Sequence, residues 1–399
     1  MLTLDRIYQA AHILKGVTRK TDLILSSNLA PDCELYLKAE NLQIKGSFKV
    51  RGAYFKIAML PECEKAKGVI ACSAGNHAQG VALAAQQSGI DATIFIPSVA
   101  PLSKIEATKR MGAQIKLIDG VYDDAFDAAL AFQKESGGVF IHPFDDIDVI
   151  AGQGTIALEI IEQLPDLDAV IVPVGGGGLI SGIAFALKML KPICKVYGVQ
   201  ATGAGSMHDS FRDKKRGSLS SVSTFADGIA VKSPGINTYE YCTKYVDEIV
   251  TVSDDEIATA ILILMEQQKL VSEGAGAVAV AAAMFHKLPI KGKTACAIVS
   301  GGNIDVNILS RVINRGLLMT GRLSELNIEM IDKPGQLKEV STIIANSGAN
   351  VTKVLHNPCG ENTDINGCYL HVSMETRNRN HLFEIKNAIK NAGYIIVED

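Results

Sequence analysis

The sequence has no tryptophan, only 12 prolines, and aromatic residues at just 6% of its 399 positions. So few aromatic side chains argue against base stacking or an aromatic cage as the mode of ligand binding. The net charge is 39 − 43 = −4 and no basic run occurs, so electrostatics support neither a nucleic-acid nor an anionic-membrane partner. Because 47% of the residues are hydrophobic, a disordered or low-complexity chain is excluded, and the length predicts two or three domains.

The eight cysteines form no C-x-x-C pair, and no histidine pair has metal-ligand spacing. Such scattered thiols are typical of reduced cytosolic proteins rather than of a disulfide framework. The longest apolar run, from Gly274 to Phe285, is shorter than the ~20 residues that a membrane-spanning helix needs. Asp5 and Arg6 place charge where a signal peptide needs an apolar stretch. We therefore expect a soluble, cytoplasmic protein.

From about residue 50 to residue 310, short Val- and Ile-rich strands alternate with helical patterns. This order predicts an α/β fold with a mostly parallel sheet covered on both faces. Ligands of such sheets bind at the carboxyl ends of the strands. We expect a catalytic domain over residues 1–318, with a smaller subdomain at roughly 50–150 inserted in it.

The pattern changes after about residue 320. A half-exposed strand over 326–331 precedes a helix over 336–347, and two strands, a helix and a final strand follow over 350–397. This βαββαβ order predicts a ferredoxin-like domain over residues 325–399.

Lys49 follows a Gly-Ser turn and lies between Phe48 and Val50. A partly desolvated amine loses its proton more easily, and a neutral lysine can form a Schiff base and later act as a general base. For one lysine alone, an exposed side chain at the start of a helix is the more frequent arrangement.

A strand over 170–174 continues into four glycines, Gly175–Gly178, and then into a helix that begins at Leu179. Glycines let backbone N–H groups approach an anion closely, and the helix dipole adds favourable charge. The segment lacks the Gly-Lys-Ser/Thr of a Walker A loop and the spacing of the dinucleotide fingerprint. It therefore favours a single phosphate over a nucleotide, although a tight turn alone is the alternative.

A second strand–turn–helix segment runs from Ser73 to Gly80. The free N–H groups at its helix start could hold a substrate carboxylate, and Asn76 could donate a hydrogen bond to a phenolic oxygen. Ser73 and Asn76 could equally be helix caps, and His77 a capping or packing residue without a catalytic role.

Ser300 ends a strand over 294–300 and precedes two glycines. A serine at the carboxyl end of a strand faces the ligand crevice in this architecture, although a Ser-Gly-Gly turn is the simpler alternative. Pyridoxal phosphate requires an amine for a Schiff base, a donor to its phenolic oxygen, a partner for its ring nitrogen and a binding site for its phosphate. Lys49, Asn76, Ser300 and Gly175–Gly178 could supply these four, in that order. A neutral serine at the ring nitrogen favours β-elimination over transamination.

As a set, segments 45–53, 73–80, 175–179, 226–231 and 300–303 resemble threonine dehydratases, fold-type II pyridoxal-phosphate enzymes related to the tryptophan synthase β chain. The C-terminal region resembles an ACT domain, with Asp332-Lys-Pro-Gly335 as its first turn. The resemblance implies dehydration and deamination of L-threonine to 2-oxobutanoate and ammonia, and of L-serine to pyruvate. It also implies a small-molecule effector at the ACT domain and a homotetramer or homodimer.

The same resemblance implies roles for individual residues. Lys49 would hold the cofactor covalently, with Phe48 near its ring, Asn76 at its phenolic oxygen and Ser300 at its pyridine nitrogen. The phosphate would be bound by the backbone of Gly175, Gly176, Gly177, Gly178 and Leu179. The substrate would be bound by Ser73, Ala74, Gly75, Asn76 and His77.

Four alternatives stay open, and the first is a dehydratase that prefers serine. Serine racemases share the architecture but carry a second serine where this chain has Ala74, and acidic metal ligands where it has Gln200 and Ser206. We therefore expect neither racemisation nor a divalent metal at that place. A β-replacement enzyme of the same fold and a non-catalytic amino-acid sensor are the other two; Lys49 and Gly175–Gly178 argue against the sensor.

Overall fold

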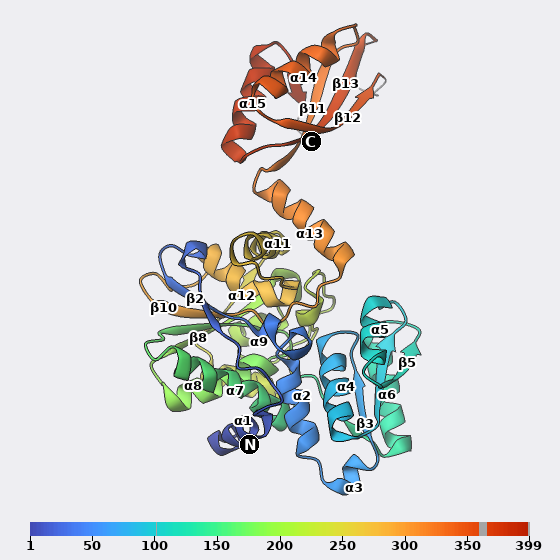
Figure 1. Cartoon of the computed structure of the whole chain (residues 1–399), viewed down its shortest axis with the longest axis vertical. Helices are drawn as coiled ribbons and strands as arrows, with labels where there is room; N and C mark the ends of the chain where they lie inside the picture. The colour runs from blue at the N-terminus through green and yellow to red at the C-terminus, as the bar shows by residue number, and fades with distance from the viewer. Residues whose placement is uncertain (101, 359–364, 398–399) are drawn as a thin grey trace. The chain divides into compact units, whose positions relative to one another are not determined.

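The computed structural model describes residues 1–100, 102–358 and 365–397 (Figure 1). It consists of two compact units, Met1–Ile308 and Leu309–Asp399, and α13 (Val306–Met319) runs across the division. The expected α/β class, with a parallel-sheet region followed by a βαββαβ domain, is confirmed.

The larger sheet of the first unit has six strands in the order β1-β2-β10-β7-β8-β9. Only β1 is antiparallel to its neighbour. The central strand β7 has the sequence Ala-Val-Ile-Val-Pro and is buried throughout, as expected for a strand covered on both faces. The strand bounds are β1 Leu23–Leu25, β2 Glu34–Lys38, β7 Ala169–Pro173, β8 Lys195–Ala201, β9 Glu248–Val252 and β10 Thr294–Ile298.

The smaller sheet has four parallel strands in the order β5-β4-β3-β6. We call this sheet and its helices the smaller subdomain, and the part of the first unit built on the six-stranded sheet the larger subdomain. The strands of the smaller sheet are β3 Val69–Cys72, β4 Ala92–Pro97, β5 Gln114–Ile118 and β6 Val139–Phe140. Helices α4 (Asn76–Ser88), α5 (Leu102–Lys109) and α6 (Tyr122–Ser136) surround these strands (Figure 1).

Helix α2 (Lys49–Ala58) packs against both α4 and α7 (Ile147–Gln163), so it links the two subdomains. Glycines make this packing close: a Cβ at Gly152 would lie 2.6 Å from Cα of Gly52, and one at Gly80 would lie 3.2 Å from the carbonyl carbon of Lys49. Arg51 of α2 forms a buried ion pair that holds the helix in place: its guanidinium lies 2.7 Å from the Glu40 carboxylate.

The sequence pattern predicts a helix over 154–164, but α7 begins at Ile147, seven residues earlier. Asp146 is the reason: its carboxylate accepts hydrogen bonds from the N–H groups of Asp148 and Val149 and so caps the helix early. The glycines at 152 and 154, which weaken a helical pattern in sequence, are interior positions required for close packing.

The short helix α3 (Glu62–Lys65) connects α2 to β3. The remaining helices of the first unit pack on the larger sheet or on one another. They are α1 Leu4–Leu14, α8 Gly178–Leu190, α9 Ser206–Arg212, α10 Ile236–Tyr245, α11 Asp254–Ile263 and α12 Gly274–Met284. Among the described residues, no helix is both long and apolar enough to cross a membrane.

The second unit is an antiparallel sheet in the order β12-β13-β11-β14 with two helices. Its apolar core includes Ile328 and Leu370 from the sheet and Ile344 and Ile385 from the helices. The elements are β11 Leu323–Ile331, α14 Gln336–Asn346, β12 Asn350–Asn357, β13 Gly367–Glu375, α15 Arg379–Asn391 and β14 Ile395–Val397.

Candidate active site

The first unit contains a cavity of about 760 Å³, a volume within the usual range for small-molecule sites. Both subdomains line it. All the residues that the sequence assigned to the site lie on its wall, so four segments far apart in the chain meet here. They are Phe48, Lys49, Ser73, Ala74, Gly75, Asn76, His77, Gly175, Gly176, Gly177, Gly178, Leu179 and Ser300.

Lys49 is the first residue of α2, and its side chain reaches into the cavity. Its Nζ donates a hydrogen bond to the carbonyl oxygen of Pro143 at 2.8 Å and lies 5.4 Å from the centroid of the Phe48 ring. Burial lowers the pKa of the amine from 10.5 to about 8, against the opposing effect of the nearby Glu273 carboxylate. Roughly a tenth of the amine is therefore neutral, and nucleophilic, at pH 7.

The glycine loop joins β7 to α8 and packs closely against Phe144. A Cβ at Gly176 would lie 2.5 Å from the Phe144 ring, and one at Gly178 would lie 2.8 Å from the Phe144 carbonyl oxygen. Gly177 has a φ of +99°, which favours glycine. Only bare backbone fits here, and the first N–H groups of α8 have no acceptor within the helix. The loop is suited to bind a phosphate group.

The turn before α4 is fixed by its own side chains and by the larger subdomain. Ser73 Oγ accepts a hydrogen bond from the Gly75 N–H at 3.1 Å. Asn76 Nδ2 donates to Glu273 Oε1 at 2.6 Å, and Asn76 Oδ1 accepts from Asn303 Nδ2 at 2.7 Å. The amide of Asn76 is thereby held at the cavity wall, with one Nδ2 hydrogen beyond the bond to Glu273.

His77 is buried, and its Nε2 lies 2.7 Å from the carbonyl oxygen of Ile141. Burial and, next, the charge of Lys49 lower the pKa of the imidazole to about 3. The ring is therefore neutral at physiological pH and is bound to main chain on one side. This arrangement favours positioning of the α4 turn over proton transfer.

Ser300 lies two residues beyond β10 and is only 3% exposed. Its Oγ donates to the Ala275 carbonyl oxygen at 3.3 Å, while its own carbonyl accepts from the Phe48 N–H at 3.2 Å. The second contact ties the serine directly to the turn that presents Lys49. A hydroxyl is thus the polar group that this strand end offers to the cavity.

Glu273, which the sequence did not single out, is the buried acid of the site. It immediately precedes α12, is 5% exposed, and lines the cavity. Burial and then the charge of Asp227 raise the pKa of its carboxyl group from 4.5 to about 7. In the sequence, the one indication of this role is that an acidic residue directly precedes the longest apolar run, Gly274 to Phe285.

His142 and Phe144 also line the cavity and were missed, because β6 before them is only two residues long. The rings are 4.6 Å apart and perpendicular. Nδ1 of His142 accepts hydrogen bonds from the N–H groups of Phe144 and Asp145, and burial lowers the pKa of the imidazole. The position after a parallel strand was the signal that could have identified them.

Two ion pairs join the subdomains beside the cavity. Lys104 of α5 contacts Asp227, and Lys232 lies 2.7 Å from Asp123 of α6. Asp227 is therefore a bridging residue at the cavity wall, and its charge also acts on Glu273.

The chain belongs to the pyridoxal-phosphate-dependent enzymes: residues 14–301 match the family model with that description, and residues 322–397 match that of the ACT domain. It is 51% identical to the L-threonine ammonia-lyase of Thermotoga maritima, over 99% of this chain and 98% of that protein. Its structure resembles the processed form of threonine deaminase isoform 2 from Solanum lycopersicum, with a TM-score of 0.74, 41% identity, and coverage of 79% and 89% of the two chains. It also resembles maize serine racemase, with a TM-score of 0.75, 35% identity, and coverage of 80% and 98%. The resemblance drawn from the motifs is confirmed.

The residues present fit pyridoxal phosphate. A Cβ at Gly176 would collide with the Phe144 ring, so the loop presents bare backbone, and the cavity holds a partly neutral lysine amine. Two uncharged donors, the Asn76 amide and the Ser300 hydroxyl, lie on the same wall.

Proposed function

We propose that this chain converts L-threonine to 2-oxobutanoate and ammonia, and L-serine to pyruvate and ammonia, with pyridoxal phosphate held at Lys49. The observation that carries the proposal is that a buried amine with a pKa of about 8 shares one cavity with the glycine loop. The 51% identity to an L-threonine ammonia-lyase over nearly the whole chain supports the choice of threonine.

In this proposal, the N–H groups of Gly175–Gly178 and Leu179 bind the phosphate. The Asn76 amide donates to the phenolic oxygen, Ser300 faces the ring nitrogen, and Phe48 lies beside the ring. When bound, the cofactor supplies an electron-withdrawing ring that stabilises negative charge at the substrate Cα. The neutral Ser300 hydroxyl keeps that withdrawal moderate, because it cannot hold a proton on the ring nitrogen as an acid would.

The substrate carboxylate is held by the turn from Ser73 to His77, where Ala74 and Gly75 leave room and the α4 N–H groups point outward from the helix start. The amine of Lys49 is free of the cofactor while the substrate is bound. In its neutral form it takes the proton from Cα, and the β-hydroxyl leaves with a proton as water. The released enamine tautomerises and is hydrolysed by one water molecule to the 2-oxo acid and ammonia. One water molecule leaves and one is taken up, so the net products of threonine are 2-oxobutanoate and ammonia.

Serine racemisation is a second candidate, because maize serine racemase has the same fold at 35% identity. It needs a second acid–base group at the substrate. In this chain the corresponding position is Ala74, whose methyl group can neither donate nor accept a proton. The sequence of the site thus favours elimination.

For the ACT domain, we infer a regulatory role through a small-molecule effector, most simply an amino acid. The start of α14, after Pro334 and Gly335, offers free N–H donors for a carboxylate. Inhibition by isoleucine opposed by valine would indicate a role in isoleucine biosynthesis, and activation by AMP a catabolic role. Unchanged responses to every amino acid after deletion of 322–399 would instead indicate that the domain only pairs subunits.

A cytoplasmic location and a homotetrameric or homodimeric state complete the proposal. All seven cysteines among the described residues are free, as expected in a reducing compartment. Light scattering of the purified protein measures the oligomeric state.

The decisive experiment is borohydride reduction of the purified holoenzyme followed by peptide mapping. We expect the label on Lys49 alone, and label on another lysine or none contradicts the proposal. Parallel assays with threonine and serine, without a second substrate, should release ammonia and 2-oxo acid. A requirement for a second substrate would indicate β-replacement, and a colourless protein without activity would indicate a sensor.

A further inference from the structure

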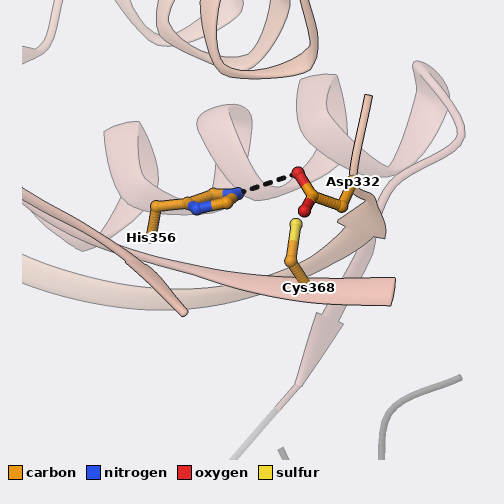
Figure 2. Close-up of side chains that lie close together, drawn as sticks. All are labelled: Asp332, His356 and Cys368. Atoms are coloured by element: carbon orange, nitrogen blue, oxygen red, sulfur yellow. Dashed lines mark ion pairs between the residues drawn. The ribbon is translucent and has the colours of Figure 1, made fainter. Parts of the chain in front are cut away.

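Three side chains of different chemistry converge at one end of the C-terminal sheet (Figure 2). Asp332 directly follows β11, His356 lies in β12 and Cys368 lies in β13. One donor atom from each falls within 4.8 Å of the others. Asp332 Oδ1 and His356 Nε2 are the closest pair, at 3.3 Å.

Strand register explains why the three meet. Cys368 pairs with Met330, and His356 pairs with Leu370, so Cys368 and His356 point to the same face of the sheet. Asp332 is two residues beyond Met330. Its N–H donates a hydrogen bond to the Asn366 carbonyl oxygen at 2.8 Å, which continues the pairing of β11 with β13 past the end of β11. The convergence is therefore built into the pairing of three strands rather than into one loop.

The donors differ in exposure. Cys368 is completely buried, whereas the side chains of His356 and Asp332 are 37% and 48% exposed. The thiol thus lies at the floor of the cluster and the other two at its rim.

We propose that Asp332, His356 and Cys368 bind one divalent transition-metal ion of the Zn²⁺ type. The carboxylate oxygen, imidazole nitrogen and thiolate sulfur are the three ligand types that Zn²⁺ takes, and the sulfur disfavours Mg²⁺ and Ca²⁺. Tetrahedral bonds of this kind place donor atoms roughly 3.5 Å apart, so small rotations of the side chains suffice to close the site. Binding releases the thiol proton to solvent, and the fourth position is left for water.

The site lies outside the catalytic unit and does not rest on the proposed enzymatic function. It is tested on the full-length protein, stripped with a chelator and titrated with Co²⁺. We expect one Co²⁺ per chain, with a thiolate-to-cobalt charge-transfer band that Zn²⁺ displaces and excess Mg²⁺ does not. Absence of the band, or its loss to Mg²⁺, overturns the proposal.

Variants locate the ion. Cys368→Ser should abolish the band, whereas Cys63→Ser, at an exposed cysteine of the first unit, should leave it unchanged. Because loss of a buried thiol could disturb folding, His356→Ala serves as a second variant at an exposed position, with His12→Ala as its control. Replacing a residue that only hydrogen-bonds to a metal ligand weakens metal binding by about 10–100-fold. Loss of His356, a ligand itself, should therefore weaken Co²⁺ binding by roughly 100-fold. A band that persists in Cys368→Ser, or equal affinity in His356→Ala and His12→Ala, refutes the site.

Discussion

Asn76 Nδ2 lies 2.6 Å from Oε1 of Glu273, across 197 positions of sequence. The bond joins the first residue of α4, in the smaller subdomain, to the residue before α12, in the larger one. Asn303 fixes the opposite end of the same amide. The group that we expect at the cofactor's phenolic oxygen is therefore oriented by a buried carboxyl group whose charge changes near neutral pH.

Replacing Glu273 with glutamine should stabilise the cofactor-free protein at high pH. The folded-state pKa of about 7 lies above the ordinary 4.5, so the folded protein favours the neutral form. The stability that this group contributes is complete below about pH 4.5 and is lost as pH rises towards 7. The difference between the two pKa values corresponds to roughly 3 kcal/mol at pH 8. We expect Glu273→Gln to raise the thermal unfolding temperature at pH 8 and to change it little at pH 5.

Glu240→Gln, at an exposed position on α10, is the matched control and should leave both temperatures unchanged. Equal destabilisation of Glu273→Gln at both pH values would show that the carboxylate is bound in its charged form.

The pKa of Lys49 predicts how cofactor uptake depends on pH. Only the neutral amine attacks an aldehyde, and this amine has a pKa of about 8. The rate of reconstitution of the cofactor-free protein should therefore rise about tenfold for each pH unit below 8 and level off above it. Stopped-flow absorbance with added pyridoxal phosphate measures the rate. A profile that keeps rising towards pH 10 would mean that the amine is not desolvated. Lys134→Ala, at an exposed lysine on α6, should leave the profile unchanged.

Much of the site could be predicted, because most of its residues directly follow strands that the local sequence pattern identifies. Gly175–Gly178 and Ser300 follow β7 and β10 of the larger sheet, and Asn76 follows β3 of the smaller one. The carboxyl ends of parallel strands are where such sheets bind their ligands. Glu273 and His142 were not predictable in the same way. Glu273 acquires its role from burial beside Asp227, and His142 follows a strand of only two residues, so the local pattern marks both only weakly. The early start of α7 depended on a cap, Asp146, that outweighed two interior glycines.

Gly176→Ala should weaken both the fold and cofactor binding. The new Cβ would lie 2.5 Å from the Phe144 ring, which already packs against His142 at 4.6 Å. Displacing that ring costs about 1–3 kcal/mol of stability, and it shifts the backbone that binds phosphate. Denaturant unfolding and equilibrium titration with pyridoxal phosphate measure the two effects. Gly217→Ala, at an exposed glycine with space for a methyl group, should change neither. Unaltered cofactor affinity in Gly176→Ala would contradict a phosphate at this loop.

Ala74→Ser tests why this site should eliminate rather than racemise. Ala74 lines the cavity in the turn between β3 and α4, where serine racemases carry a serine. Racemisation needs one group to remove the Cα proton and another to return a proton from the opposite face, and a positioned acid–base group contributes about 10²–10⁴-fold. The wild type should convert L-serine to pyruvate without D-serine, and Ala74→Ser should form D-serine at a rate roughly 10²-fold above that background.

Ala74→Gly removes the methyl group without adding a hydroxyl, so it controls for altered space in the turn. Chiral chromatography of the reaction mixture decides the outcome. D-serine from the wild type, or equal amounts from Ala74→Ser and Ala74→Gly, would mean that the second proton comes from a group other than residue 74.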